Sequence, residues 1–286
     1  MHLHGVGPSA EWVFPSDFSH KVKVTAPRVA RSFANDGYAV IPNVLSSLDA
    51  DHTACALSGI LGEKAGTRRL LDIEWCGRLA DKLNDEPRLR EFLPASARAV
   101  QCTLFTKTAE SNWLVSLHQD LSIPVAEWVE SAACSGWSQK QGDTFVQPPV
   151  SVLENVLAVR LHLDNCDERN GALRVVPGSH RLGRLSSDEA LREREARGER
   201  VVSVPKGGAM IMRPLLLHAS SKSSVAFPRR VLHLVYGPAA LPEGLRWPSR
   251  KQSLPTVSGR SSPNNWWHLN FPSLREDFPT PHPLLD

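Results

Sequence analysis

The residues best suited to chemistry are His118 and Asp120, with His218 one hundred positions further on. Two imidazoles and one carboxylate form the facial triad that holds non-haem Fe(II) and leaves coordination positions open. Residues i and i+2 of a strand point to the same side, so His118 and Asp120 can bind one metal together. The third ligand must come from a strand adjacent in space, and His218 directly follows the apolar run 215–217. These residues predict a mononuclear Fe(II) site.

Two arginines follow His218 on the next candidate strand. Arg229 lies eleven residues beyond His218, and Arg230 stands beside it. A guanidinium can bind a carboxylate through two parallel hydrogen bonds, so an arginine here could hold the distal carboxylate of a 2-oxo acid. We take Arg229 as the working assignment. The adjacent Arg230 leaves a one-residue ambiguity.

A second His-x-Asp pair, His162 and Asp164, competes for the metal. Its strand alternates cleanly, with apolar residues on one face and Arg160, His162 and Asp164 on the other. Asp164 leads into the turn 165–171, where a carboxylate more often accepts hydrogen bonds from local backbone N–H groups. The pattern favours His118 over His162 as the metal ligand, because the strand of His118 ends nearby and a metal site at the rim of a barrel needs such a strand end. His162 remains a candidate for lining the barrel.

The remaining histidines have simpler interpretations. His180 follows a Pro-Gly-Ser turn and is expected to be structural. His233 shares the strand face of Arg229 if alternation holds, and we interpret it as a packed histidine rather than a ligand. His2 and His4 lie near the start of the chain, where a terminus without fixed structure is expected.

Composition excludes several classes of protein. The chain has 286 residues, of which 41% are hydrophobic, enough for a sizeable core, and its net charge of +3 does not demand nucleic acid as a partner. The charge run 188–200 mixes both signs and is typical of a solvated helix face. We find no apolar run of about 18 residues that could span a membrane, and no apolar signal-peptide core. The five cysteines contain no C-x-x-C pair, which favours buried thiols in a reducing cytoplasm.

The order of elements predicts the fold class. Helices are expected over residues 27–35, 48–61, 71–83 and 86–92, with a short strand at 38–41. From residue 97 onward the pattern changes to period two. It predicts strands at 99–107, 114–120, 156–164, 173–176, 209–218 and 229–236, separated by turns. Helices followed by many short strands favour a mainly β antiparallel jelly roll with a helical flank.

The chain is expected to form one domain over residues 1–286, since β barrels of this length often do. Its helical flank covers about 27–96, and an irregular, proline-rich tail covers about 242–286. The tail carries Trp247, Trp266 and Trp267. We expect it to wrap the barrel and to cover its mouth.

Residues 125–150 form a long insertion between predicted strands, of the kind that shapes a pocket. The insertion carries Trp128, Trp137, Lys140 and Phe145. Each aromatic is more often packing than recognition, so the insertion does not identify the group that the substrate presents.

Four stretches of the chain together resemble the phytanoyl-CoA dioxygenase family. They are residues 33–42, the motif His118-Gln119-Asp120, residues 170–173 leading to 177–180, and residues 218–221 with the later arginine. The resemblance covers roughly residues 28–240, most of the chain. It implies an oxygenase on a double-stranded β-helix, a cupin-like jelly roll, that depends on Fe(II), 2-oxoglutarate and O2.

The resemblance also implies roles for individual residues. The residues that match the iron ligands, and so the catalytic centre, are His118, Asp120 and His218. Arg229 matches the arginine that binds the C5 carboxylate of 2-oxoglutarate, and Ser220 matches the hydroxyl near it. Gln101 matches a co-substrate contact, and Trp137 matches an aromatic wall position.

The implied activity is hydroxylation of an aliphatic C–H bond of a small molecule, such as a natural product, an amino acid or an acyl derivative, with release of succinate and CO2. Asp120 argues against a halogenase, which needs the carboxylate position free for halide. Two alternatives stay open: a non-catalytic jelly-roll binding protein, and a cupin-like isomerase or hydrolase with another divalent ion. The second gives Arg229 no role. The sequence names neither the primary substrate nor the oligomeric state.

Overall fold

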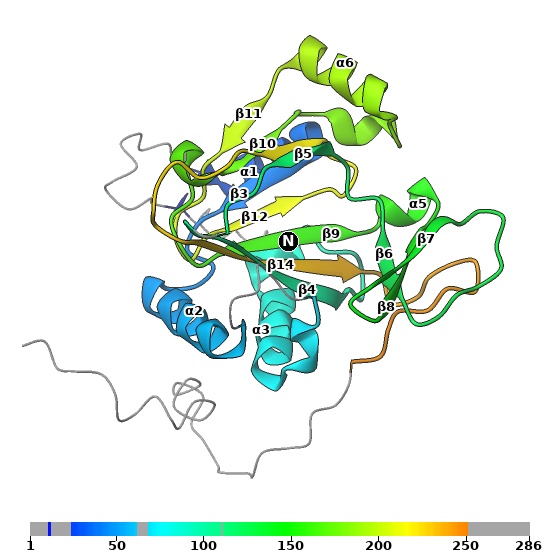
Figure 1. The fold of residues 1–286 in the computed structure, drawn as a ribbon, viewed down its shortest axis with the longest axis horizontal. Helices are drawn as coiled ribbons and strands as arrows, with labels where there is room; N and C mark the ends of the chain where they lie inside the picture. Colours follow the sequence, from blue (N-terminus) through cyan, green and yellow to red (C-terminus); the bar gives the residue numbers. More distant parts are fainter. Residues whose placement is uncertain (1–10, 13–23, 62–67, 110, 251–286) are drawn as a thin grey trace, which may run out of the picture.

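The fold is built from short antiparallel strands arranged in facing sheets, with helices outside them (Figure 1). This computed structural model of the chain describes residues 11–12, 24–61, 68–109 and 111–250. Apolar residues of the two larger sheets meet in one buried cluster, to which Met210 and Met212 contribute from one sheet and Val175 and Val202 from the other. The two sheets therefore pack face to face.

The larger sheet has five strands. In spatial order these are β3 (Tyr38–Ile41), β12 (Ala209–Met212), β9 (Leu157–His162), β14 (Arg229–Gly237) and β4 (Arg98–Lys107). All neighbours are antiparallel. The central strands β9 and β14 place Val231 opposite His162 and His233 opposite Arg160. This register brings polar side chains from three strands together on one face.

The other sheets are smaller. The four-stranded sheet contains β11 (Arg200–Val202), β10 (Leu173–Val175), β13 (His218–Ser220) and β5 (Val115–His118). The three-stranded sheet contains β6 (Ile123–Val125), β8 (Asp143–Gln147) and β7 (Ser135–Lys140), and a two-stranded one pairs β1 (Glu11–Trp12) with β2 (Val24–Thr25). The expected insertion at 125–150 is thus mainly the β7–β8 hairpin.

Helices α2 (Ser47–Leu61) and α3 (Glu74–Asp85) cover the outer face of the five-stranded sheet, where Figure 1 shows them beneath β14 and β4. The other helices of the described chain are α1 (Ala26–Asp36), α4 (Pro87–Arg90), α5 (Val150–Leu153) and α6 (Ser187–Arg197), with 3-10 turns η1 (Leu70–Asp72), η2 (Glu168–Asn170) and η3 (Ser179–Leu182). Leu57 of α2 and Leu79 of α3 are fully buried in the largest apolar cluster. Helix α6 confirms the solvated helix predicted from the charge run, since Ala190 is its one buried residue.

Strand β9 shows how the sequence separates the two faces of this sheet. Leu157, Val159 and Leu161 enter the cluster beneath the helices. Because alternate side chains of a strand point to opposite faces, Arg160 and His162 point between the sheets. Both are buried, with exposed fractions of 5% and 3%. The inner face of the sheet therefore carries the polar side chains that form a site.

The expected jelly roll is confirmed, although the described sheets do not close into a barrel. The continuous strand predicted at 209–218 is wrong. Residues 209–212 belong to the five-stranded sheet, and β13 begins at His218 in the four-stranded sheet. Pro214 has no backbone N–H to continue the ladder, so the chain leaves one sheet and crosses to the other. Strand β5 likewise ends at His118, before Asp120.

The tail is described only as far as residue 250. Trp247 packs against Gly237 and donates its Nε1–H to the Pro238 carbonyl at 2.8 Å, beside the end of β14. Trp266 and Trp267, like His2 and His4, lie outside the described residues, so the expectations for them stay predictions. No helix in the described ranges is long and apolar enough to cross a membrane.

The side chain of Gln119 fastens the end of β5 to the chain before β13. Its amide Nε2 donates to the carbonyls of Leu215, at 2.7 Å, and Gly183, at 2.8 Å. Its Oε1 accepts from the Leu185 N–H at 2.9 Å. Gln119 is only 9% exposed. The middle residue of the motif therefore points away from its two neighbours and acts as a structural clamp.

A backbone hydrogen bond completes this fastening. The Asp120 N–H donates to the Pro214 carbonyl at 2.9 Å. Next to it, β5 and β13 pair with His118 opposite His218. Two segments a hundred residues apart are thereby held in one register at one end of the sandwich.

We expect Gln119→Ala to destabilise the fold, because it leaves the buried Leu215 carbonyl and two part-buried backbone groups without this side-chain partner. A buried group left unpaired costs about 1–3 kcal/mol, so the free energy of unfolding should fall by about 2 kcal/mol. Urea titration followed by circular dichroism measures the change. Gln139→Ala is the matched control, since the exposed side chain of Gln139 bonds to Thr144 Oγ1 and its loss should change the free energy of unfolding by no more than about 0.5 kcal/mol. Equal effects of the two variants would refute the clamp.

Candidate metal centre and its cavity

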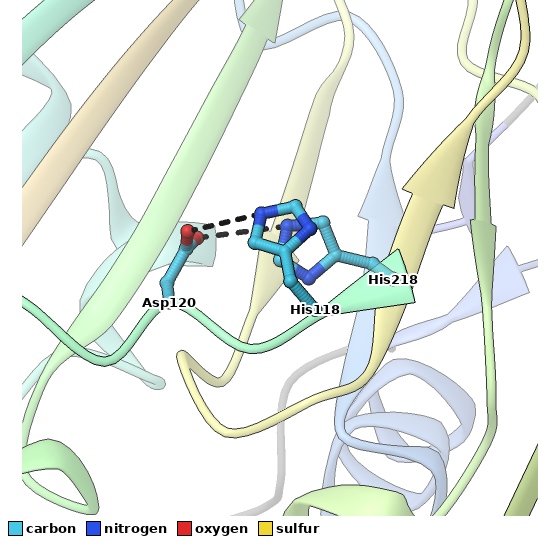
Figure 2. A group of neighbouring side chains, drawn as sticks. All are labelled: His118, Asp120 and His218. Carbon is cyan, nitrogen blue, oxygen red and sulfur yellow. Dashed lines mark ion pairs between the residues drawn. The ribbon is translucent and has the colours of Figure 1, made fainter. Parts of the chain in front are cut away.

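Three potential metal donors converge where β5 and β13 meet. His118, Asp120 and His218 each place one donor atom within 4.8 Å of the others. Figure 2 shows both imidazoles turned toward the Asp120 carboxylate, with each Nε2 3.7 Å from one of its oxygens. The ring centroids are 4.2 Å apart. Two nitrogens and one oxygen on one side of a point are the donor set that suits Fe(II) and leaves the opposite side open.

Backbone carbonyls orient both imidazoles. His118 Nδ1 lies 2.8 Å from the Ser116 carbonyl, and His218 Nδ1 lies 2.9 Å from the Leu216 carbonyl. A carbonyl oxygen only accepts, so each Nδ1 carries the proton and each Nε2 keeps its lone pair for a metal. Such contacts fix the tautomer and the ring orientation of metal-binding histidines.

The electrostatics favour an ionised carboxylate beside imidazoles that can bind metal. Burial alone would raise the pKa of Asp120, but His218 and His118 hold it well below its usual range. Burial lowers the pKa of His218 to about 4, so this ring is neutral at pH 7. Burial opposes a charge on His118 as well, yet the Asp120 carboxylate 3.7 Å from its Nε2 raises its pKa. A metal cation would take the place of that proton.

The donors open onto a cavity with two connected lobes. The inner lobe has a volume of about 240 Å³ and runs between the two larger sheets past His218, Ser220 and Arg229. The outer lobe has a volume of about 250 Å³ and runs toward β7 and β8 past Lys140 and Phe145. The residues that line both lobes are Arg68, Phe105, His118, Asp120 and His233. The metal donors thus stand at the junction of the lobes.

Arg229 and Arg230 point in opposite directions, as adjacent strand residues must. Arg229 is 3% exposed, lines the inner lobe and donates to the Gly171 carbonyl at 2.8 Å. Its Nε has no hydrogen-bond partner within the described ranges. Arg230 instead forms a two-pronged ion pair with Asp164, at 2.7 and 2.9 Å. Only Arg229 is available to a ligand in the cavity.

A buried lysine supports Ser220 in the inner lobe. Lys107 is fully buried, and its Nζ donates to Ser220 Oγ at 2.9 Å and to the Ser221 carbonyl. Because Ser220 accepts that bond, its own hydroxyl proton is free to be donated to a ligand. Burial, and then the charge of Arg229, lower the pKa of Lys107 to about 8. Because Lys107 and Arg229 lie so close together, the site favours a negatively charged ligand.

Arg160 and His233 of the five-stranded sheet form part of the wall of the inner lobe. Arg160 Nη1 lies 3.0 Å from His233 Nδ1. A guanidinium only donates, so His233 accepts through Nδ1 and carries its proton on Nε2. Burial lowers the pKa of His233 to about 3, in agreement with a neutral ring. His233 is packed as expected and is no part of the donor group, but it also lines both lobes.

The competing pair lies elsewhere. His162 is buried, and neither ring nitrogen has a hydrogen-bond partner among the described residues. Asp164 accepts a hydrogen bond from the backbone N–H of Arg230 on the neighbouring strand, so the expected bond to a local turn N–H is wrong. As expected, Asp164 is not part of the metal-donor group. His180 lies in η3 with its ring against Gly37, which agrees with a structural role.

Two further predicted contacts are placed differently. Gln101 lies on β4, lines the outer lobe and donates its amide to Thr103 Oγ1 at 2.9 Å. Trp137 lies on β7 with its ring centroid 5.9 Å from that of Trp128. Trp137 is not among the described residues that line either lobe. The co-substrate roles of both stay predictions.

Several polar residues of the cavity were missed from the sequence, chiefly Lys107, Arg160 and Arg68. Lys107 is six residues beyond Gln101 on one strand, so period two places both on the same face. Arg160 interrupts an apolar strand two residues before His162, which is the signal that could have found it. Arg68 lies in a loop, where no periodicity predicts its direction.

Several solved structures share this fold. One is the non-haem α-ketoglutarate-dependent epimerase SnoN from nogalamycin biosynthesis, at 16% identity and a TM-score of 0.57, covering 77% of this chain and 84% of that one. EctD from S. alaskensis with bound Fe gives 20% identity and a TM-score of 0.58, covering 77% and 79%. HygX from Streptomyces hygroscopicus with nickel and 2-oxoglutarate gives 18% identity and a TM-score of 0.50, covering 75% and 88%. At such identities the likeness shows the fold.

The family is shown by sequence. No curated protein gives a significant match to the chain. The family model for phytanoyl-CoA dioxygenase matches residues 33–231, well over half of the chain. Its enzymes use Fe(II), 2-oxoglutarate and O2, and the matched span contains all three candidate donors, His118, Asp120 and His218. The chain belongs to the phytanoyl-CoA dioxygenase family.

Proposed function

We propose that this chain is an Fe(II)- and 2-oxoglutarate-dependent dioxygenase that hydroxylates an aliphatic C–H bond of a small molecule, with release of succinate and CO2. The observation that carries the proposal is one cavity that joins three metal donors, within 4.8 Å of one another, to the buried guanidinium of Arg229. A metal site alone would suit many reactions. The arginine adds a counter-charge for a dicarboxylate.

In this proposal His118, Asp120 and His218 hold the iron. Bound there, Fe(II) with 2-oxoglutarate and O2 supplies the oxidising chemistry for the C–H bond. The two imidazoles and the carboxylate all line the inner lobe, so a metal that they held would be open to ligands in the cavity. The protein's contribution is therefore to leave open positions for ligands and to set the direction from which the substrate approaches.

The inner lobe would hold the distal carboxylate of the co-substrate. Arg229 offers a guanidinium in a partly dry setting, where a charge-assisted pair is strong. Ser220 offers its hydroxyl proton, since Lys107 occupies an acceptor position of the same oxygen. Asp120 is the only acid among the described residues lining either lobe. A dicarboxylate would thus offset cations that are costly to bury alone.

Asp120 also bears on the type of reaction. Its carboxylate fills the position that a halogenase would leave to a halide, so hydroxylation is favoured over halogenation. The non-catalytic alternative gives no reason for a clustered donor set. The cupin-like isomerase or hydrolase gives no role to Arg229 or to Ser220. Once a substrate is found, mass spectrometry distinguishes the outcomes: hydroxylation adds one oxygen atom, desaturation or ring closure removes two hydrogens, and epimerisation leaves the mass unchanged.

We expect a visible metal-to-ligand charge-transfer band when 2-oxoglutarate is added anaerobically to the Fe(II)-loaded protein. Only a chelating 2-oxo acid on the iron produces it, so the band separates the proposal from both alternatives. With O2 admitted, succinate should form slowly in the absence of primary substrate and stop on addition of EDTA. Turnover that persists in EDTA would remove iron from the proposal.

The same assay tests the donor assignment. His118→Ala and His218→Ala should each abolish the band and the turnover, because two remaining ligands hold the iron poorly. His162→Ala is the matched control: it also removes an inward-facing imidazole, but one outside the donor group. Loss of iron from the His162 variant, with iron retained by the His118 variant, would reverse the assignment.

We expect Arg229→Ala to weaken 2-oxoglutarate binding while the iron stays bound. Leaving one partner of a buried charge pair unpaired costs about 2–5 kcal/mol. That is a roughly thirtyfold to several-thousandfold rise in Kd, since each 1.4 kcal/mol is about tenfold. Titration of the charge-transfer band gives the Kd directly.

Arg230→Ala is the internal control for this prediction. It breaks the pair with Asp164 outside the cavity and should lower Tm with little change in the 2-oxoglutarate Kd. A large loss of affinity in the Arg230 variant alone would shift the assignment by one residue. No loss in either variant would place the co-substrate elsewhere.

A further inference from the structure

Two cations from separate parts of the chain meet at the outer lobe. Lys140 closes strand β7, and Arg68 precedes η1. Both line the lobe. The Arg68 N–H donates to Gln141 Oε1 at 3.0 Å, which fixes Arg68 beside the turn that follows Lys140. A contact across 73 residues of sequence thus holds the segment of Arg68 next to the end of β7, and both cations line the outer lobe.

These cations have no acidic partner in the part of the chain that the structure describes. The neighbouring Arg69 differs, since it pairs with Asp72 at 2.9 Å and with Asp143 at 3.7 Å. The acids nearest in sequence to Arg68 and Lys140 are therefore engaged by another arginine. The two cations are left facing the cavity.

An aromatic ring holds the lysine in place. Lys140 Nζ lies 4.9 Å from the ring centroid of Phe145, which is itself 3% exposed and lines the outer lobe. An ammonium over a ring face is attracted by the ring quadrupole without being neutralised. The charge is thus positioned at the cavity and stays available to a ligand.

The charge balance of the whole site leaves these cations unmatched. Two positive charges on iron and two negative charges on 2-oxoglutarate cancel. The single charge of Asp120 then stands against the buried Lys107, Arg160 and Arg229, before the outer pair is counted. A cavity with one sign of charge and low-dielectric walls concentrates ligands of the opposite sign.

We propose that the primary substrate carries an anionic group, a carboxylate or a phosphate, that Arg68 and Lys140 bind at the rim of the outer lobe. This proposal rests on the proposed function, because it takes the metal centre as the place of reaction. The rest of the molecule would lie along Phe145 and Val156, with its reacting carbon toward Asp120. A lobe of about 250 Å³ suits a compact acid.

The test uses three probes of one shape: phenylacetate, phenyl phosphate and the neutral phenylacetamide. Each is titrated calorimetrically into the anaerobic complex of the protein with Fe(II) and 2-oxoglutarate. We expect at least one anion to bind about tenfold or more tightly than the amide. The tighter of the two anions decides between carboxylate and phosphate. Equal Kd values for the amide and both anions would overturn the proposal.

Variants assign the effect to the two residues. Lys140→Gln and Arg68→Gln should each weaken binding of the preferred anion about tenfold or more and leave the amide unchanged. Arg246→Gln is the matched control, because it removes one positive charge that pairs with Glu127 on the exposed surface. Anion binding that survives both lobe variants, or that falls equally in the control, would refute a specific site.

The charge-transfer band distinguishes a failure of this proposal from a failure of the proposed function on which it rests. It is recorded on the same sample before each titration. If the band does not form, the proposed function fails, whatever the probes do. If it forms in the Lys140 and Arg68 variants with an unchanged 2-oxoglutarate Kd, a loss of anion binding belongs to the outer lobe. A loss confined to 2-oxoglutarate would move Arg68 into the co-substrate site and overturn its proposed role.

Discussion

One backbone hydrogen bond, from the Asp120 N–H to the Pro214 carbonyl, joins the two segments on which the metal centre depends. Asp120 lies beyond the end of β5, where no ladder holds it, and Pro214 lies in the turn that carries the chain to His218. The side chain of Gln119 adds three hydrogen bonds beside it, to the backbone of Gly183, Leu185 and Leu215. Side chains that must converge to within a few ångströms cannot be set by loops alone, because a loop that is free on one side samples many conformations. The crossing between sheets is what makes the donors converge.

The inner face of the five-stranded sheet has an unusual composition for the interior of a protein. Lys107, Arg160 and Arg229 are all buried there, and the cost of such groups is offset only by good partners. Their carbonyl, hydroxyl and imidazole contacts satisfy part of their hydrogen-bonding capacity and none of their charge. A bound dianion should therefore contribute to folding stability as well as to reaction, since a ligand that binds only the native state shifts the unfolding equilibrium.

Much of this was predictable from local pattern. Alternation along 157–162 correctly separated the apolar face from the polar face, and the sequence pattern picked out His118, Asp120 and His218, which the fold brings within 4.8 Å of one another. The predictions that failed depend on contacts between distant parts of the chain. The run 209–218 looks like one strand in the sequence, but its first half pairs in the five-stranded sheet and its end pairs in the four-stranded sheet. Alternation along its strand gives the face of Lys107 but not its role, since its partner Ser220 is 113 residues away and is brought near only by the packing of the sheets.

The two lobes share lining residues, among them Arg68, Phe105 and His233. Ligands that contact the same side chains cannot be energetically independent. Whatever factor a molecule in one lobe imposes on the affinity of the other, the second imposes on the first by the same factor. Two anions that both interact with the Arg68 guanidinium weaken each other's binding, whereas ordering of His233 and Phe105 by one ligand favours binding of the other. The balance of these terms fixes whether the two ligands bind with positive or negative cooperativity.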